Sequence, residues 1–247
     1  MIPKIIHYCW FGKGAYTDKV KQCLASWQQV LGDYEIKLWN EENVNLEESP
    51  YIRDAYATGN YSFVSDHTRM KVLAEYGGIY LDVDMEVLRP LDSFLHHRLC
   101  LGTDDTGTIE TVMMAEPHHP ILEAAYREYK HRAFILPDGS YNKEVPNVLL
   151  NRLLVPYGFR ERNERLSLAD GIEIYPDDYF QGISLVSGKM HRTENTHIIH
   201  WHTLLWVSPR TRILRWLRMK LFVPLLGPTR YLRLKSALCR VLPLLRK

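Results

Sequence analysis

The sequence has few cysteines, and their spacing does not suit zinc binding or a disulfide framework. The four cysteines lie far apart and form no Cys-x-x-Cys pair: they are Cys9, Cys23, Cys100 and Cys239. Small disulfide-linked domains and zinc ribbons bring their cysteines into close, regular spacing. The pattern therefore argues against both, and it is typical of a protein from a reducing compartment.

The sequence also lacks an apolar targeting segment before its first expected strand. Pro3 and Lys4 interrupt the start of the chain, and Ile5-Ile6 is followed directly by His7. A secretory signal needs an uninterrupted apolar stretch after its basic start. We therefore expect a cytoplasmic protein.

Acidic residues are missing from the C-terminal end. From Pro209 onward there are eleven Lys and Arg residues and no Asp or Glu, so the 31 basic and 29 acidic residues divide into 20 against 29 before Pro209 and 11 against 0 after it. The net charge of +2 therefore combines a body of 20 − 29 = −9 with a tail of +11. We expect one domain over residues 1–208 and a separate tail over residues 209–247.

The tail combines basic residues with an apolar face at helical spacing, in two halves separated by Gly227-Pro228. Neither half reaches the roughly 20 uninterrupted apolar residues that span a bilayer. Basic helices with a Trp, Phe and Leu face are typical of segments that lie on an anionic membrane surface. We expect residues 209–247 to bind the inner face of the cytoplasmic membrane peripherally. Nucleic-acid binding, packing on the acidic body and dimerisation are the alternatives, and we do not expect a nucleic-acid partner.

Strand and helix patterns alternate along the body, and the chain is 46% hydrophobic, which is enough for a buried core. The spacing predicts helices over residues 17–31, 49–57, 62–76, 120–132 and 145–155. It predicts strands over residues 4–10, 34–39, 79–81, 99–102, 111–115 and 196–206, an edge strand or turn over 87–91, and a strand and turn over 173–180. This alternation predicts an α/β fold with a mixed, mostly parallel sheet flanked by helices.

Residues 61–86 are the stretch around which the rest is organised: a helix, a glycine break, and a strand that ends in carboxylates. Asp66 and Arg69 stand three residues apart and so share a helical face, where an ordinary surface ion pair is the alternative to a functional one. Asp82 and Asp84 stand two residues apart, and on an extended backbone they point to the same side. The chemistry is therefore expected where this strand ends.

Two carboxylates on one side of a strand repel each other unless they are solvated or share a cation. Oxygen ligands favour Mg²⁺ or Mn²⁺ over zinc, and these ions leave coordination positions open for substrate phosphates. We therefore predict that Asp82 and Asp84 bind Mn²⁺ or Mg²⁺ on a diphosphate; a solvated acidic pair is the alternative.

The same stretch resembles the signature of a known family. From Ser65 to Asp84 it reads Ser-Asp-x-x-Arg and then Tyr-Gly-Gly-Ile-Tyr-Leu-Asp-x-Asp. This resembles glycosyltransferase family 32, the DXD-containing sugar transferases, which include capsular-polysaccharide transferases and the initiating mannosyltransferases of fungal glycans. It is also similar to the catalytic core of the large bacterial glucosylating toxins. The resemblance implies a GT-A-like, Rossmann-like catalytic domain over residues 1–208, followed by the basic amphipathic tail.

The resemblance also implies roles for several residues in donor binding. Asp66 and Arg69 would bind hydroxyls of the donor sugar and ribose, with Tyr80 nearby. Trp10 follows the first expected strand, and by its match to the family it would pack against the uracil or guanine of the donor; a core position is the alternative.

Two histidines near the end of the body are further candidates for the site. His200 and His202 alternate onto one face of the strand predicted there, which favours contact with metal or phosphate. The family ends its catalytic domain with a His-His-x-x-x-Ser-Trp-like motif. Aligning its Trp with Trp206, a candidate donor contact, places its first His on His200, its second on Trp201 and its Ser on Leu205. Either His200 or His202 is thus the predicted third metal ligand.

The resemblance implies a metal-dependent, retaining hexosyltransferase that uses a UDP- or GDP-sugar donor. The acceptor would be a glycan or lipid-linked oligosaccharide in the synthesis of a surface polysaccharide such as a capsule. No residue stands out as a covalent nucleophile, so we expect the leaving phosphate to assist attack on its own face. Two alternatives are a membrane-surface protein that binds a sugar nucleotide or phosphoglycan without turnover, and a metal-dependent phosphohydrolase.

Overall fold

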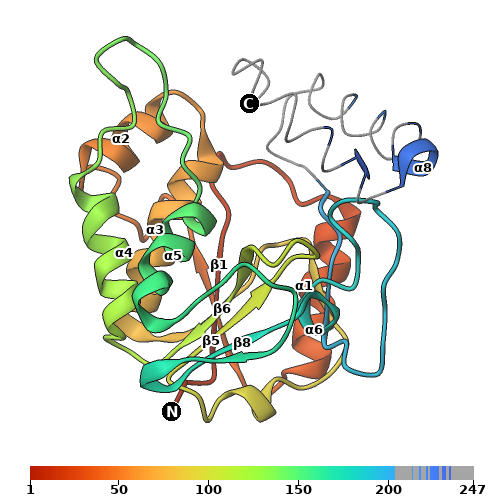
Figure 1. Cartoon of the computed structure of the whole chain (residues 1–247). Coiled ribbons are helices and arrows are strands. Elements are labelled where there is room, and N and C mark those ends of the chain that lie inside the picture. Colours follow the sequence, from red (N-terminus) through yellow and green to blue (C-terminus); the bar gives the residue numbers. More distant parts are fainter. Residues whose placement is uncertain are drawn as a thin grey trace.

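The computed structural model describes residues 1–203 and, beyond them, residues 213, 217, 221, 223–227, 230–231 and 234. A seven-stranded sheet of order β2-β1-β3-β6-β5-β8-β7 lies at its centre (Figure 1). The strands of this sheet are β1 (Ile5–Cys9), β2 (Glu35–Trp39), β3 (Gly78–Tyr80), β5 (Leu99–Thr103), β6 (Ile109–Ala115), β7 (Leu166–Ser167) and β8 (Ile172–Tyr175). A separate two-stranded sheet pairs β4 (Met85–Val87) with β9 (Ile198–His200).

Most strands of the large sheet point the same way. β1 is parallel to β2 and β3, and β5 is parallel to β8. β6 runs antiparallel to its neighbours β3 and β5, and β7 runs antiparallel to β8. All strands except β6 and β7 therefore share one direction, so their carboxyl ends meet at one edge, where α/β proteins bind ligands. The predicted mixed, mostly parallel sheet is confirmed.

Helices cover both faces of the sheet (Figure 1). On one face lie α2 (Pro50–Ala57), α3 (Tyr61–Tyr76), α4 (Pro120–His131) and α5 (Pro146–Leu154), and on the other lie α1 (Asp18–Val30) and α6 (Asp177–Phe180). Short 3₁₀ helices occur at Asp92–Phe94, Val155–Tyr157 and Ala169–Gly171. Thr17 and Ser49 accept backbone hydrogen bonds at the starts of α1 and α2, as N-caps do. The predicted helices therefore form within one or two residues of their expected ends.

Two glycines fix how the central helix meets the central strand. Gly77 ends α3 with φ 63°, and a Cβ there would lie 2.7 Å from the carbonyl oxygen of Ala115. A Cβ on Gly78 would lie 2.6 Å from the carbonyl oxygen of Ile5. Only residues without a side chain let β3 enter between β1 and β6 at this angle. The predicted helix stop is confirmed, and it sets the distance between α3 and the carboxylates after β3.

Two predicted strands differ from the structure. The strand or turn predicted over residues 87–91 is the three-residue strand β4, which begins earlier, at Met85, and pairs with β9. The strand predicted over residues 196–206 ends at His200, because the backbone turns at His202 with φ 48°. The pairing of β4 with β9 joins segments more than 100 residues apart, and no local pattern predicts it.

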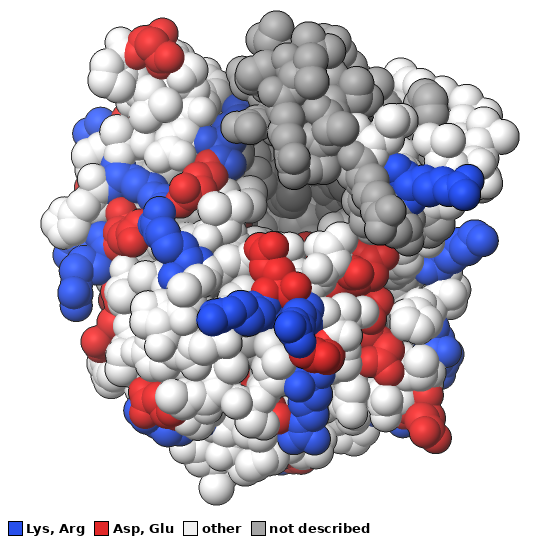
Figure 2. Space-filling view, viewed as in Figure 1, with Lys and Arg blue, Asp and Glu red and all other residues white. Residues whose placement is uncertain are grey.

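The basic tail lies mostly outside the described residues, as does the predicted domain boundary at residue 208. Of its helices the structure describes α8 (Val223–Leu226), which ends before Gly227. Among the residues described, no helix combines the length and apolarity that crossing a membrane requires. On the face shown in Figure 2, Lys and Arg side chains of the body lie among Asp and Glu side chains, so their charges are interspersed.

His7 in β1 makes a pH-dependent contribution to stability. Its ring is fully buried; Nδ1 accepts a hydrogen bond from Trp39 Nε1 (3.0 Å), and Nε2 donates to the carbonyl of Gly77 (2.8 Å). Burial lowers its pKa to about 4, against about 6.5 in an unfolded chain. Stability from the neutral ring is thus complete above pH 6.5 and lost as the pH falls toward 4.

We therefore expect the His7 contribution to the free energy of unfolding to fall by about 2–3 kcal/mol when the pH is lowered from 7.5 to 4.5. Urea unfolding at both pH values should show a smaller pH-dependent loss for His7→Gln than for the unmodified chain. Exposed His131→Gln is the control and should keep the full loss. Equal losses for His7→Gln and the unmodified chain would contradict this role.

Candidate functional site

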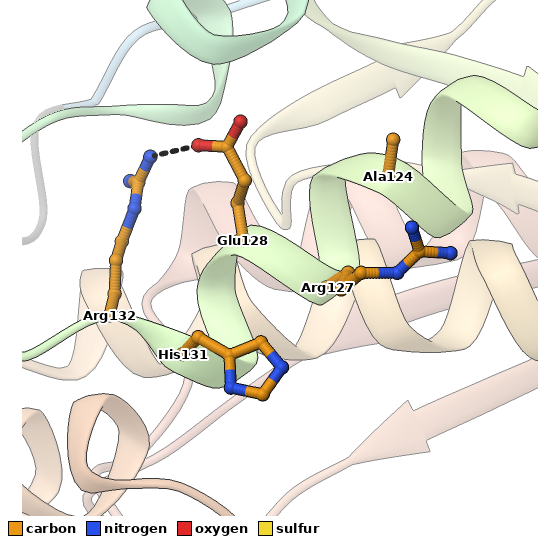
Figure 3. A pocket seen from close by; sticks show the side chains of 5 residues that line it. All are labelled: Ala124, Arg127, Glu128, His131 and Arg132. Atoms are coloured by element: carbon orange, nitrogen blue, oxygen red, sulfur yellow. Dashed lines mark hydrogen bonds and ion pairs between the residues drawn. The ribbon is translucent and has the colours of Figure 1, made fainter.

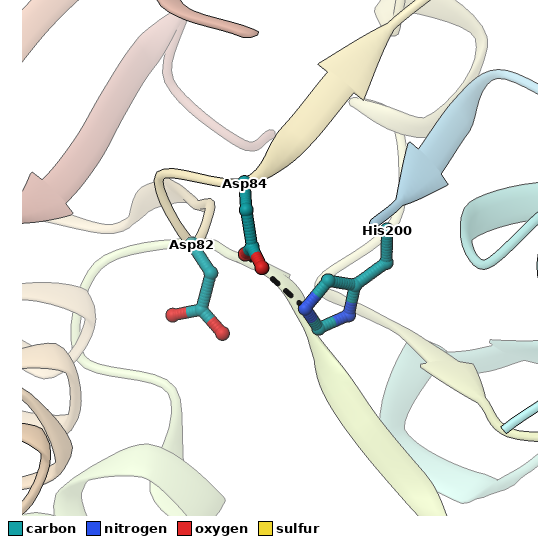
Figure 4. A group of neighbouring side chains, drawn as sticks. All are labelled: Asp82, Asp84 and His200. Carbon is teal, nitrogen blue, oxygen red and sulfur yellow. Dashed lines mark ion pairs between the residues drawn. The ribbon is translucent and has the colours of Figure 1, made fainter. Parts of the chain in front are cut away.

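Asp82 and Asp84 lie in the tight turn between β3 and β4. The Met85 N–H donates to the carbonyl of Asp82 (3.0 Å), so the backbone between the two residues is not extended as predicted. The turn nevertheless brings both carboxylates to His200 at the end of β9 (Figure 4). One ligand atom from each of these three residues lies within 4.8 Å of the others, and the searched part of the chain holds no second such group.

Asp84 is the most strongly held member of this group. Its Oδ2 accepts hydrogen bonds from Thr203 N (2.7 Å) and Thr203 Oγ1 (2.8 Å), and its Oδ1 lies 3.4 Å from His200 Nε2. Burial raises the pKa of Asp84, but His200 and Thr203 outweigh burial and hold it well below the ordinary value. Asp84 is therefore a carboxylate at neutral pH, as a metal ligand must be.

The segment after β9 is fixed to the aspartate turn by Trp201. Its N–H donates to the carbonyl of Asp84 (3.0 Å), and its Nε1 donates to Glu86 Oε2 (2.8 Å). Lys19 of α1 lies over the indole, with Nζ 3.8 Å from the ring centroid. These contacts hold His200 next to Asp84. Sequence reasoning missed Thr203 and these contacts of Trp201, because both depend on the long-range pairing of β4 with β9.

His202 lies beside His200 but outside the three-residue group. Its ring packs on that of His200, with centroids 3.8 Å apart, although the backbone turns between them. His202 is not part of the three-residue group. The geometry therefore favours His200 over His202 as the third ligand, and the predicted donor contact Trp206 lies outside the described residues.

Asp66 and Arg69 are buried, so the alternative of a surface ion pair is wrong. Their side chains are 9% and 8% exposed, and Arg69 Nη2 lies 3.0 Å from Asp66 Oδ1 and 3.4 Å from Asp82 Oδ1. The guanidinium also lies 4.6 Å from the centroid of the Tyr80 ring. Arg69 thus connects α3 to the aspartate turn. Burial raises the pKa of Asp66 to about 6, although Arg69 acts to lower it.

Trp10 is half-buried in the loop after β1. Its indole Nε1 donates to the carbonyl of Gly14 (2.7 Å), and its ring meets Tyr16 edge-on at 4.8 Å. Gly12 in the same loop donates to Glu41 Oε1 (2.7 Å), which ties the loop to the end of β2. Trp10 is therefore not a fully buried core residue, and its predicted contact with a base stays a prediction.

The three-residue group suits a hard divalent cation. It offers two carboxylates and one imidazole, and His200 Nδ1 is buried without a hydrogen-bond partner in the described chain. Carboxylates are preferred by Mg²⁺ and Mn²⁺, and a ligand set of three leaves coordination positions for phosphate oxygens. The residues present thus fit the predicted cation.

A pocket on the outer side of α4 does not belong to this group. It is lined by Ala124, Arg127, Glu128, His131 and Arg132, and Glu128 forms an ion pair with Arg132 (Figure 3). It shares no residue with Asp82, Asp84 or His200, and we assign it no role.

Comparison with known proteins bears on this site. Residues 17–100 match the family described as glycosyltransferase sugar-binding region containing DXD motif. This segment holds Asp66, Arg69, Asp82 and Asp84. Residues 17–100 are therefore similar to the sugar-binding region of DXD-containing glycosyltransferases, in the same stretch where the sequence resembles that family.

Two curated relatives are yeast enzymes of lipid glycosylation. The chain is 32% identical over 141 residues to inositol phosphoceramide mannosyltransferase 3 of Schizosaccharomyces pombe, covering 54% of this chain and 38% of that protein. It is 31% identical over 139 residues to mannosyl phosphorylinositol ceramide synthase CSH1 of Saccharomyces cerevisiae, covering 53% and 36%. The chain thus spans less than two fifths of these relatives' length.

Among solved structures, the chain is similar to the galactosyltransferase LgtC in complex with donor and acceptor sugar analogues. The sequence identity is 14%, the TM-score is 0.45, and the match covers 88% of this chain and 97% of that one.

Proposed function

We propose that this protein is a metal-dependent, retaining glycosyltransferase that moves a hexose from a nucleotide-diphosphate sugar to a lipid-linked glycan or phosphoglycolipid. The observation that carries the proposal is the convergence of Asp82, Asp84 and His200, within a segment that matches a DXD-containing sugar-binding region. The names of the yeast relatives favour a mannose donor and a phosphoinositol-type lipid acceptor. Assembly of a surface polysaccharide is the wider setting that we propose.

Each side chain has a definite part in this proposal. Asp82, Asp84 and His200 would hold Mn²⁺ or Mg²⁺, which supplies positive charge opposite the leaving diphosphate. Asp66 accepts a hydrogen bond from a donor-sugar hydroxyl, and Arg69 fixes its orientation through their 3.0 Å ion pair. Trp10 packs on the base at the end of β1.

The chain need not supply a covalent nucleophile for retention. The bond from the anomeric carbon to the phosphate oxygen breaks, and a bond to the acceptor oxygen forms on the same face of the sugar. The acceptor hydroxyl gives its proton to the departing phosphate. The protein's part is to hold both reactants in this geometry, which alone lowers barriers substantially.

Donor turnover tests the proposal directly. The full-length protein is incubated with Mn²⁺ and a panel of UDP- and GDP-sugars that includes GDP-mannose, with and without inositol phosphoceramide or another acceptor glycolipid. We expect slow donor hydrolysis alone, transfer when the acceptor is added, and loss of both with EDTA. Donor binding without turnover would identify a binding protein, and general cleavage of phosphomonoesters would identify a phosphohydrolase.

We also propose that the protein works at the cytoplasmic face of the membrane, held by residues 209–247. The support is the excess of eleven basic residues and the absence of acidic residues there. Full-length protein should float with vesicles that contain phosphatidylserine and remain unbound to neutral phosphatidylcholine vesicles. Deletion of residues 209–247 should abolish flotation, because about 1 kcal/mol of attraction per basic residue is lost. Unbound full-length protein would contradict membrane attachment.

A further inference from the structure

Gln181, which follows α6, is buried with a side-chain amide that lacks hydrogen-bond partners among the described residues. It is 1% exposed, and neither its side-chain oxygen nor its side-chain nitrogen hydrogen-bonds to any residue that the structure describes. An unsatisfied buried polar group costs about 1–3 kcal/mol, so folded proteins seldom keep an amide with both ends unpaired. A ligand that supplies the missing hydrogen bonds would explain why glutamine stands here.

The backbone of Gln181 is connected to the candidate metal ligands. Its carbonyl accepts a hydrogen bond from the N–H of His200 (2.9 Å). At the next residue, a Cβ on Gly182 would lie 2.9 Å from Ile199 Cγ1, so this segment lies tightly against β9. The unpaired side-chain amide therefore belongs to Gln181, a residue whose backbone contacts His200 at the end of β9.

A bulge in β6 brings a second polar group to the same place. Leu101 pairs with Met113, and Thr103 pairs with Ile109. Gly102 of β5 therefore lies opposite three residues of β6, residues 110–112. Bulges of this kind redirect side chains next to active sites. Glu110 lies in this bulge, opposite Gly102 of β5.

The end of α6 packs on β5 at the residue opposite this bulge. A Cβ on Gly102, the β5 residue opposite the bulge, would lie 2.8 Å from Cδ2 of Phe180. Phe180 immediately precedes Gln181. Three segments that are distant in sequence, the bulge, the end of α6 and the end of β9, therefore converge on His200.

We propose that the Gln181 amide and the Glu110 carboxylate bind hydroxyl groups of the donor sugar. The inference rests on the proposed function and adds two positioning residues to it. A sugar attached to a diphosphate lies next to the cation that holds the phosphates, and His200 would be a ligand of that cation. The amide can donate to one hydroxyl and accept from another, and the carboxylate accepts from a third. Both amide atoms are shielded from water in this structure, so the proposal requires the residues around Gln181 to move apart when the sugar binds.

The test compares a nucleoside diphosphate with its sugar conjugate. Calorimetry with Mn²⁺ measures Kd for GDP and GDP-mannose, and for UDP and UDP-glucose, on the full-length protein. Gln181→Leu should weaken binding of the sugar nucleotide about tenfold, the loss expected for one or two hydrogen bonds, and leave Kd for the diphosphate within twofold. Glu110→Gln should weaken the sugar nucleotide severalfold with the same selectivity.

Stability separates this role from a purely structural one. Gln181→Leu and Gln181→Met replace an unpaired amide with apolar groups of similar size, so both should melt at or above the temperature of the unmodified protein. Gln28→Leu and Glu35→Gln, both on the surface, are the controls and should change neither affinity.

Several results would overturn the inference. Equal losses of diphosphate and sugar-nucleotide binding, or no selective loss, would contradict a sugar contact. Strong destabilisation by both Gln181 variants would show that the amide serves the fold. If the unmodified protein binds none of the sugar nucleotides, the proposed function itself fails, which is a distinct outcome.

Discussion

Asp84→Asn is expected to lower metal-dependent donor turnover by a factor on the order of 10³. Charge stabilisation by a bound cation contributes several kcal/mol to such reactions, and each 1.36 kcal/mol changes the rate tenfold. Asparagine keeps an acceptor for Thr203, which donates to Asp84 at 2.7 and 2.8 Å, but it loses the negative charge that faces His200. The measurement is the rate of donor hydrolysis against Mn²⁺ concentration, with folding checked by circular dichroism.

The control for this substitution is Asp18→Asn, which removes a carboxylate that is 96% exposed at the start of α1. It should leave the rate within a factor of two. Donor turnover by Asp84→Asn within tenfold of the unmodified protein, with the same dependence on Mn²⁺, would show that the cation is not held at this turn.

Arg69→Met is expected to destabilise the protein by about 3–5 kcal/mol. Removing one partner of a buried ion pair leaves the other charge buried without compensation. Arg69 lies between Asp66 and Asp82, at 3.0 and 3.4 Å, with Tyr80 beneath its guanidinium. Because total stabilities are typically 5–15 kcal/mol, this loss is a large part of the whole. Urea unfolding at pH 7.5 measures it.

Two comparisons sharpen the Arg69 prediction. Asp66→Asn combined with Arg69→Met should recover part of the loss, because the stranded carboxylate is gone. The loss should also shrink as the pH falls toward about 6. Burial raises the pKa of Asp66 to about 6 although Arg69 acts to lower it, so without Arg69 this carboxyl takes up a proton at a higher pH and becomes neutral. Arg53→Met, at an exposed pair with Asp54, should cost less than 1 kcal/mol. Equal losses at Arg53 and Arg69 would contradict a buried network.

Local sequence patterns predicted the first half of the site well. The helix with Asp66 and Arg69, the glycine stop and the strand before Asp82 depend on spacing and on glycine conformation, which are local properties. The same local rules predicted an extended Asp82–Asp84 pair and an alternating His200–His202 pair, and both backbones instead turn. Tertiary pairing of β4 with β9 overrides strand alternation there.

The residues that sequence reasoning missed all depend on contacts between distant segments. Thr203 caps Asp84 from a position 119 residues later in the chain, and Trp201 meets Glu86 across 115 residues. Gln181 stands out because its buried amide lacks partners among the described residues, a property that no sequence pattern shows.

The most direct test of the whole account is the position of a bound cation. Crystals of the protein soaked with MnCl₂ and GDP, or with UDP where that nucleotide binds more tightly, would be measured at the manganese absorption edge. We predict an anomalous peak between the Asp82 and Asp84 carboxylates and His200, in contact with the diphosphate. A bound nucleotide whose diphosphate lies away from these three residues, or a manganese peak elsewhere, would contradict the account.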